Sequence, residues 1–93
     1  MIDSNEVLKD LGGVALTYEE GTEEHSLTVG YVISRILITE QPSSDPLRSY
    51  MLAQSIYSGE EIKDADIAFI KKSVTSTKMY LPIVIGQLLN LLK

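Results

Sequence analysis

The stretch TVGYVISRILIT, residues 28–39, carries the clearest structural signal in the chain. Its aliphatic residues recur at the spacing of an α-helix with one buried face: Val29, Val32, Ile33, Ile36 and Leu37. Thr28 precedes them and is a typical N-cap residue. Pro42 disfavours helical geometry at the residue before it, within the polar segment 41–45, so we expect this helix to end near Thr39.

A second helix is expected over residues 46–58. Asp45 is suited to cap its N-terminus, and Pro46 is suited to its first position, where a missing backbone N–H does no harm. Gly59 is a typical residue to end it. This segment is apolar on more than one face, which indicates a central helix or one that contacts a partner.

Two more helices are expected towards the C-terminus. Asp64 is expected to cap a helix over about residues 65–75, with Ile67, Ile70 and Val74 facing the core. The hydroxyl-rich run 73–77 is expected to fray into a loop, because Ser and Thr side chains compete for backbone hydrogen bonds.

The last helix is expected over residues 82–92, with Pro82 at its first position. Its predicted inner face is formed by four aliphatic residues at helical spacing: Ile85, Leu88, Leu89 and Leu92.

The segment before residue 29 has the pattern of short β-strands. Gly12-Gly13 suits a two-residue hairpin loop, and the alternation of Val14, Leu16 and Tyr18 with less apolar residues predicts a strand over 14–18. A second turn over 19–22 would let residues 24–28 return as another strand. The predicted fold class is therefore α+β and mostly α: an N-terminal β-hairpin or meander followed by about four packed helices in a single domain, residues 1–93.

Composition narrows the classes of function. The chain has 93 residues, 44% of them hydrophobic and 23% charged, with a net charge of −5 and no cysteine. It cannot form a disulfide, a thiolate nucleophile or a sulfur-ligated zinc site, and a cytoplasmic location is expected. The longest apolar stretch, 81–92, is about 12 residues, whereas a membrane span needs roughly 20. Charged residues interrupt the first apolar positions, so no secretory signal is expected.

No pattern of reactive residues indicates an enzyme. His25 lies among four glutamates, but neither metal-site histidine spacing nor a calcium-loop spacing is present, so a solvated turn is favoured over a metal site. Paired acids occur at Glu60-Glu61 and at Asp64 with Asp66 and could in principle act as general acid and base. A structural role is favoured, because helix capping and the helix dipole explain Asp64 and Asp66. We therefore assign no catalytic residue, no cofactor and no metal ligand.

The apolar surplus of the second and last helices points to protein contact. Tyr and Met are enriched in protein interfaces. The candidate interface residues are Tyr50, Met51, Tyr57, Tyr80, Leu88 and Leu91. The alternative, that these side chains are all internal, stays open at this point, and a second copy in a homodimer is one candidate partner. Lys71, Lys72 and Lys78 with Tyr80 offer a weaker site for a nucleic-acid backbone, which is not the favoured partner.

Several segments together resemble a known group of proteins. They are Leu27-Thr28-Val29-Gly30, Tyr50-x-Leu52-Ala53-x-x-Ile56-Tyr57, Asp66-Ile67-Ala68-x-Ile70-Lys71-Lys72 and Pro82-x-Val84-x-Gly86-Gln87. This order is similar to that of small phage and prophage proteins of mostly uncharacterised function.

The resemblance implies a non-enzymatic accessory protein that binds a protein partner of host or phage origin in the host cytoplasm. The alternatives are a structural component of the virion or of tail assembly, and a nucleic-acid-associated regulator. No catalytic residue is carried over from the resemblance.

Overall fold

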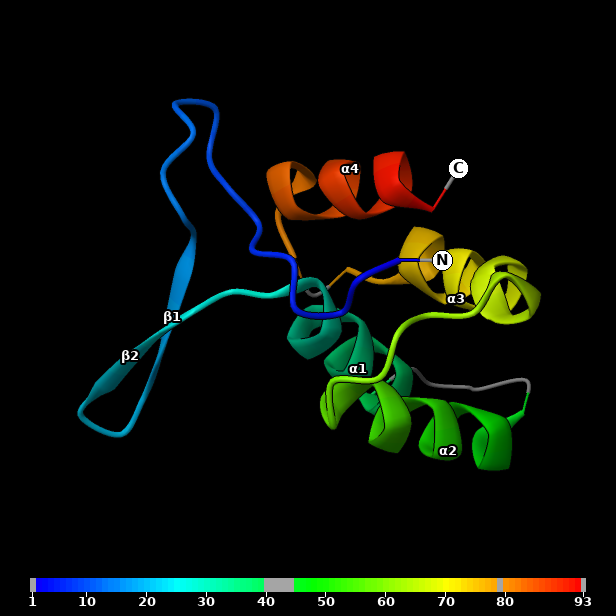
Figure 1. Cartoon of the computed structure of the whole chain (residues 1–93). Helices are drawn as coiled ribbons and strands as arrows, with labels where there is room; N and C mark the ends of the chain where they lie inside the picture. Colours follow the sequence, from blue (N-terminus) through cyan, green and yellow to red (C-terminus); the bar gives the residue numbers. More distant parts are fainter. Residues whose placement is uncertain (1, 40–44, 79, 93) are drawn as a thin grey trace.

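The computed structural model describes residues 2–39, 45–78 and 80–92. Two strands come first, β1 (Thr17–Glu20) and β2 (Glu23–Ser26), and four helices follow in the described ranges (Figure 1). The helices are α1 (Val29–Thr39), α2 (Pro46–Tyr57), α3 (Asp64–Ser76) and α4 (Pro82–Leu91). The predicted class, α+β and mostly α, is confirmed. None of the described helices combines the length and apolarity needed to cross a bilayer.

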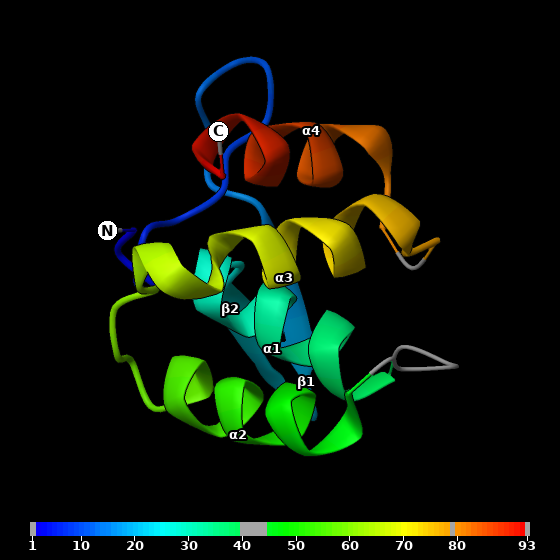
Figure 2. The same ribbon diagram turned by 90° about the vertical axis from the view of Figure 1, so that its right-hand side faces the viewer.

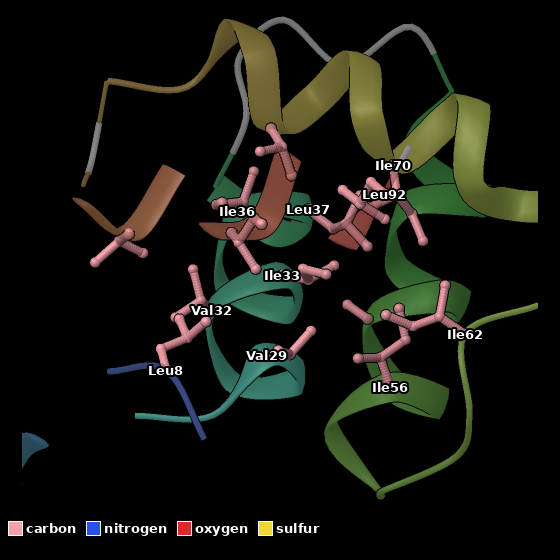
Figure 3. Packing of buried hydrophobic residues seen from close by; sticks show 14 of the residues in the cluster. Leu8, Val29, Val32, Ile33, Ile36, Leu37, Ile56, Ile62, Ile70 and Leu92 are labelled. Carbon is pink, nitrogen blue, oxygen red and sulfur yellow. The ribbon is translucent and has the colours of Figure 1, made fainter. Parts of the chain in front are cut away.

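Helix α1 lies at the centre of the molecule. It packs against α2 on one side and against α3 on the other, and α4 covers α3 (Figures 1 and 2). The five aliphatic residues of its predicted stripe are all at most 2% exposed. They join residues from the N-terminal segment and from the other helices in one hydrophobic cluster (Figure 3). Its buried members are Leu8, Leu27, Val29, Val32, Ile33, Ile36, Leu37, Ala53, Ile56, Ile62, Ile70, Val74, Val84, Leu88 and Leu92.

Backbone hydrogen bonds join the N-terminal segment to the first turn of α1. The Ser4 carbonyl accepts a hydrogen bond from Gly30 N–H at 2.7 Å, and the Glu6 carbonyl accepts one from Val29 N–H at 2.8 Å. Thr28 Oγ1 accepts from the Tyr31 N–H at 3.1 Å, which confirms Thr28 as the N-cap. The free N–H groups that begin a helix are thus satisfied from within the chain.

The two strands of the β-hairpin begin and end at other residues than the sequence predicts. Its strands are β1 and β2, rather than 14–18 and 24–28, and the turn contains Gly21, whose φ of 65° suits glycine. Around Gly12-Gly13 the chain does turn, with the Asp10 carboxylate accepting from the N–H groups of residues 12 and 14, but only an isolated bridge joins Lys9 to Ala15. Val14 is 65% exposed, because no core element covers it. The prediction of a strand with a buried face at Val14 is therefore wrong.

Helix α2 begins at Pro46 as predicted and ends at Tyr57, one residue earlier than expected, with the predicted stop at Gly59. Asp45 Oδ1 accepts a hydrogen bond from the Arg48 N–H at 3.2 Å, and Pro46 occupies the first turn. At the other end Gly59 has a φ of 94° and donates to the Ile56 carbonyl at 3.0 Å, while Glu60 N–H reaches the carbonyl five residues before it. This pair of bonds is a Schellman motif, which requires the left-handed conformation that glycine adopts readily.

Helix α3 corrects two predictions. Asp64 is its first residue and Lys63 takes the N-cap position. The helix also continues to Ser76 instead of fraying at residue 73, because Thr75 Oγ1 and Ser76 Oγ donate to the carbonyls of Lys71 and Lys72 at 2.8 and 3.0 Å. A hydroxyl that bonds back to the carbonyl four residues earlier no longer competes with the helix.

Helix α4 begins with Pro82 in its first turn, as predicted, and ends at Leu91, one residue earlier than expected. Leu88 and Leu92 are fully buried as expected, but Val84 completes the inner face. Ile85 and Leu89 are only half-buried.

Candidate functional site

A groove lined by three tyrosines lies between α1 and α2. Its volume is about 350 Å³, and Tyr31, Tyr50 and Tyr57 form its aromatic walls. The remaining lining residues are Glu20, Ser34, Arg35, Ile38, Ala53 and Gln54. We call this hollow the tyrosine groove. Its size and its mostly apolar lining with a few polar groups are typical of a binding site.

Helical spacing builds the groove from both sides. Tyr31, Arg35 and Ile38 are four and three residues apart on α1, so they lie along one flank of that helix. On α2, Tyr50 and Tyr57 are two turns apart, and the buried Ala53 lies between them. The small Ala53 side chain leaves the space that the tyrosine rings surround.

Hydrogen bonding and ring stacking fix the tyrosines in place. Gln54 Nε2 donates to Tyr50 Oη at 3.1 Å, one helical turn away. Tyr31 stacks on Tyr18 of β1 with ring centroids 4.0 Å apart and planes 11° apart. The ring of His25 of β2 also stacks on Tyr18, with centroids 5.4 Å apart and planes 29° apart. The rings of the hairpin therefore hold Tyr31 in a defined orientation.

Arg35 connects the groove to Tyr80. Its guanidinium carbon lies 5.9 Å from the centroid of the Tyr31 ring and its charge also interacts with the Tyr80 hydroxyl. Burial raises the pKa of Tyr80, and Arg35 partly offsets this effect by favouring the ionised form. Partial burial likewise raises the pKa of Tyr18, as do the nearby hydroxyls of Tyr31 and Tyr57.

All five tyrosines of the chain therefore lie around one region. These tyrosines are spread along the sequence from residue 18 to residue 80, so only the fold brings them together.

Beside the groove, α2 presents a second apolar surface to solvent. Leu47, Tyr50, Met51 and Tyr57 are between 57% and 68% exposed. With Gln54 they form what we call the outer face of α2. Ile38 of α1, also 57% exposed, adjoins it through the groove. The exposed fractions of these side chains contradict the alternative that this helix is wholly internal.

The six candidate interface residues divide into two groups. Tyr50, Met51 and Tyr57 lie on the outer face of α2. Leu88 does not belong to any accessible surface: it is fully buried in the core, because α4 turns that side towards α3. Leu91 and Tyr80 are half-buried, and Tyr80 interacts electrostatically with Arg35 and Tyr31 of the groove.

Sequence reasoning missed Tyr31, Tyr18 and Ile38 as parts of this site. A signal for two of them was present, since Tyr31, Arg35 and Ile38 form a second stripe on α1 beside the aliphatic one. Nothing in the local sequence placed Tyr18 against Tyr31, because that contact depends on how the hairpin folds back.

Other charged side chains form isolated pairs in the described residues. His25 lies 3.5 Å from the Glu23 carboxylate on the exposed hairpin. Within the described ranges no three acidic or histidine side chains gather as a metal site would require. Asp66 pairs with Arg48 at 3.1 Å, so it has a structural partner.

The residues of the candidate nucleic-acid site lie on α3 and in the segment that follows it. Lys71 and Lys72 are exposed on α3 and Lys78 follows that helix, whereas Tyr80 interacts with Arg35 of α1.

No protein-family model matches the chain, and neither curated proteins nor solved structures give a significant match. The groove and the outer face of α2 are therefore interpreted from their own geometry and chemistry.

Proposed function

We propose that this protein acts without catalysis, by binding another protein through the outer face of α2 and the tyrosine groove. One observation carries the proposal: Leu47, Tyr50, Met51 and Tyr57 are each more than half exposed on the same helix. A contiguous apolar patch of this kind is costly in water and marks an interaction site more often than an ordinary surface.

The chemistry of the patch favours a protein partner. Tyrosine offers a large, rigid contact area and a hydroxyl for hydrogen bonding, which makes it frequent at the centres of protein interfaces. Stacking on Tyr18 and the hydrogen bond from Gln54 hold two of the groove tyrosines before any partner arrives. A partner therefore meets a preorganised surface, which reduces the entropy lost on binding.

We further propose the setting that the resemblance to phage and prophage proteins implies, in which the partner is a host factor. A nucleic-acid regulator is the less favoured alternative, because a net charge of −5 opposes approach to a phosphate backbone.

Affinity capture from host-cell lysate tests the proposal with the tagged protein and two variants. Tyr57→Asp places a charge on the outer face of α2, while Leu11→Asp makes the same kind of change at a residue that is 99% exposed in the N-terminal turn. We expect captured proteins to be retained by the wild type and by Leu11→Asp, and to be reduced at least about tenfold with Tyr57→Asp. Recovery of the same proteins by all three would refute the assignment of this surface.

A further inference from the structure

The outer face of α2 lies at an edge of the molecule. In Figures 1 and 2, α2 packs against α1 on one side, and its opposite side is covered by no drawn element. Resting on the proposal that this face binds protein, we propose that in the absence of that partner the face is occupied by a second copy of the same chain, which the partner would displace. Two α2 helices would lie antiparallel about a twofold axis near Leu52.

The exposed area is near what a small dimer interface needs. Tyr50 and Tyr57 are 57% and 67% exposed, and together they present about 250 Å² if a tyrosine offers roughly 200 Å². Leu47, Met51 and Ile38 expose comparable fractions of smaller side chains, which brings the apolar patch to about 500 Å² per copy.

Two such patches would remove about 1,000 Å² from water, and the polar rim around them would bring the interface into the range of about 1,200 Å² upwards seen in specific complexes. This area predicts a reversible dimer rather than an obligate one.

The charge distribution favours a like surface over a charged partner. Arg48 is the only charged residue among the twelve of α2, and it is paired with Asp66 at 3.1 Å. At the rim of the groove Glu20 and Arg35 carry opposite charges. A strongly acidic or basic partner would find no counter-charge here, whereas a second copy brings the same uncharged face. The net charge of −5 opposes contact between copies through more acidic surfaces.

The arrangement of the side chains suits a self-complementary contact. Leu47 and Tyr57 stand five residues on either side of Leu52, so a twofold axis there exchanges the two ends of the outer face. Tyr57 of each copy would then lie beside Tyr50 and the tyrosine groove of the other. Gln54 lies near the axis, where the two helices approach each other.

Sedimentation of the purified full chain over a range of concentrations tests the proposal. We expect the mass to rise from 10.3 kDa towards twice that value as concentration increases. Tyr57→Asp should raise the dimer dissociation constant at least about tenfold, and Leu11→Asp should leave it unchanged. Circular dichroism verifies that each variant keeps its helices.

A second measurement exploits the lack of cysteine in the chain. Gln54→Cys introduces a unique thiol near the proposed axis, and a short thiol-specific cross-linker should join two copies through it. Lys71→Cys, on the exposed side of α3, is the matched control and should give little dimer.

A wild type that stays at 10.3 kDa at every concentration overturns the self-association proposal. If Tyr57→Asp still abolishes capture of other proteins in that case, the proposed function survives. A dimer that Tyr57→Asp does not weaken places self-association on another surface and overturns the self-association proposal, whereas the capture experiment still decides the proposed function. Species larger than a dimer overturn the closed twofold arrangement and favour an assembly component.

Discussion

Replacing Gly30 by alanine tests which of two effects on stability is larger at the start of α1. One is the higher helix propensity of alanine, and the other is the close packing of Gly30 against Ser4 and Ile56. Gly30 is the second residue of α1, where its N–H donates to the Ser4 carbonyl at 2.7 Å. A Cβ at this position would lie 2.8 Å from that same carbonyl oxygen, 2.9 Å from Ser4 Cβ and 3.1 Å from the Ile56 carbonyl oxygen. Two of these three neighbours are backbone atoms, which cannot move aside by changing rotamer.

The magnitude follows from two opposing effects. Alanine in place of glycine favours a helix by up to about 1 kcal/mol. Overpacking against backbone destabilises a folded protein by about 1–3 kcal/mol. Because the contacts at Gly30 are all too short, we expect the second effect to dominate and Gly30→Ala to lower the free energy of unfolding by about 1–2 kcal/mol, or the melting temperature by roughly 5–15 °C.

Gly86 in α4 provides the matched control, because a Cβ there would meet no atom within 4 Å. Gly86→Ala should raise the free energy of unfolding by about 0.5–1 kcal/mol. Denaturant and thermal unfolding, followed by circular dichroism, measure both variants. If Gly30→Ala is as stable as the wild type or more so, the close packing of Ser4, Gly30 and Ile56 is not as described. The placement of Tyr31 and Tyr57, which follow two of these residues, would then also lose its basis.

Four other predictions concern stability. Leu88→Ala should lower the free energy of unfolding by about 2–5 kcal/mol, because Leu88 is fully buried, whereas Leu81→Ala, 71% exposed, should change it by less than about 0.5 kcal/mol in the same denaturant assay. Equal effects would contradict the assignment of Leu88 to the core. The Ser4 hydroxyl is buried with no hydrogen-bond partner among the described residues, so Ser4→Ala should be neutral or stabilise by up to about 1 kcal/mol, and a clear loss of stability would refute this.

Ser34→Ala should instead destabilise slightly in that assay, since Ser34 Oγ donates to the Tyr31 carbonyl at 2.9 Å. The pKa of Tyr80 is raised from its ordinary value of 10.0 by burial, so the unfolded chain ionises first and stability should fall as pH rises above 10. Tyr80→Phe should reduce that fall, which unfolding measured across this pH range would show.

The helices could be predicted from the sequence because their signals are local. The stripe of α1, the Asp45 and Pro46 start of α2 and its Gly59 stop all act within one or two turns of the chain. The errors arose where local signals compete. Hydroxyl groups from residue 73 onward could either break α3 or donate to backbone carbonyls within it. Ser73 and Val74 are buried, which favours the longer helix.

The site was predicted only in part. Tyr50, Met51 and Tyr57 were expected as contact residues because α2 is apolar on more than one face, and they are exposed. The same reasoning selected Leu88, which lies in the core. Composition and spacing are alike for these residues, so the sequence could not separate the two cases.

The amino-acid sequence by itself determined the helical segments, most of their boundaries and the apolar surplus, since these depend on neighbours within a few residues. Only the tertiary structure decided which apolar face of α2 is covered by α1, how the hairpin pairs, and that Tyr31, Tyr50 and Tyr57 line one groove while Tyr18 stacks on Tyr31. The physical reason is that burial is set by contacts between distant parts of the chain, and a local pattern that is apolar on two faces does not specify which face will meet them.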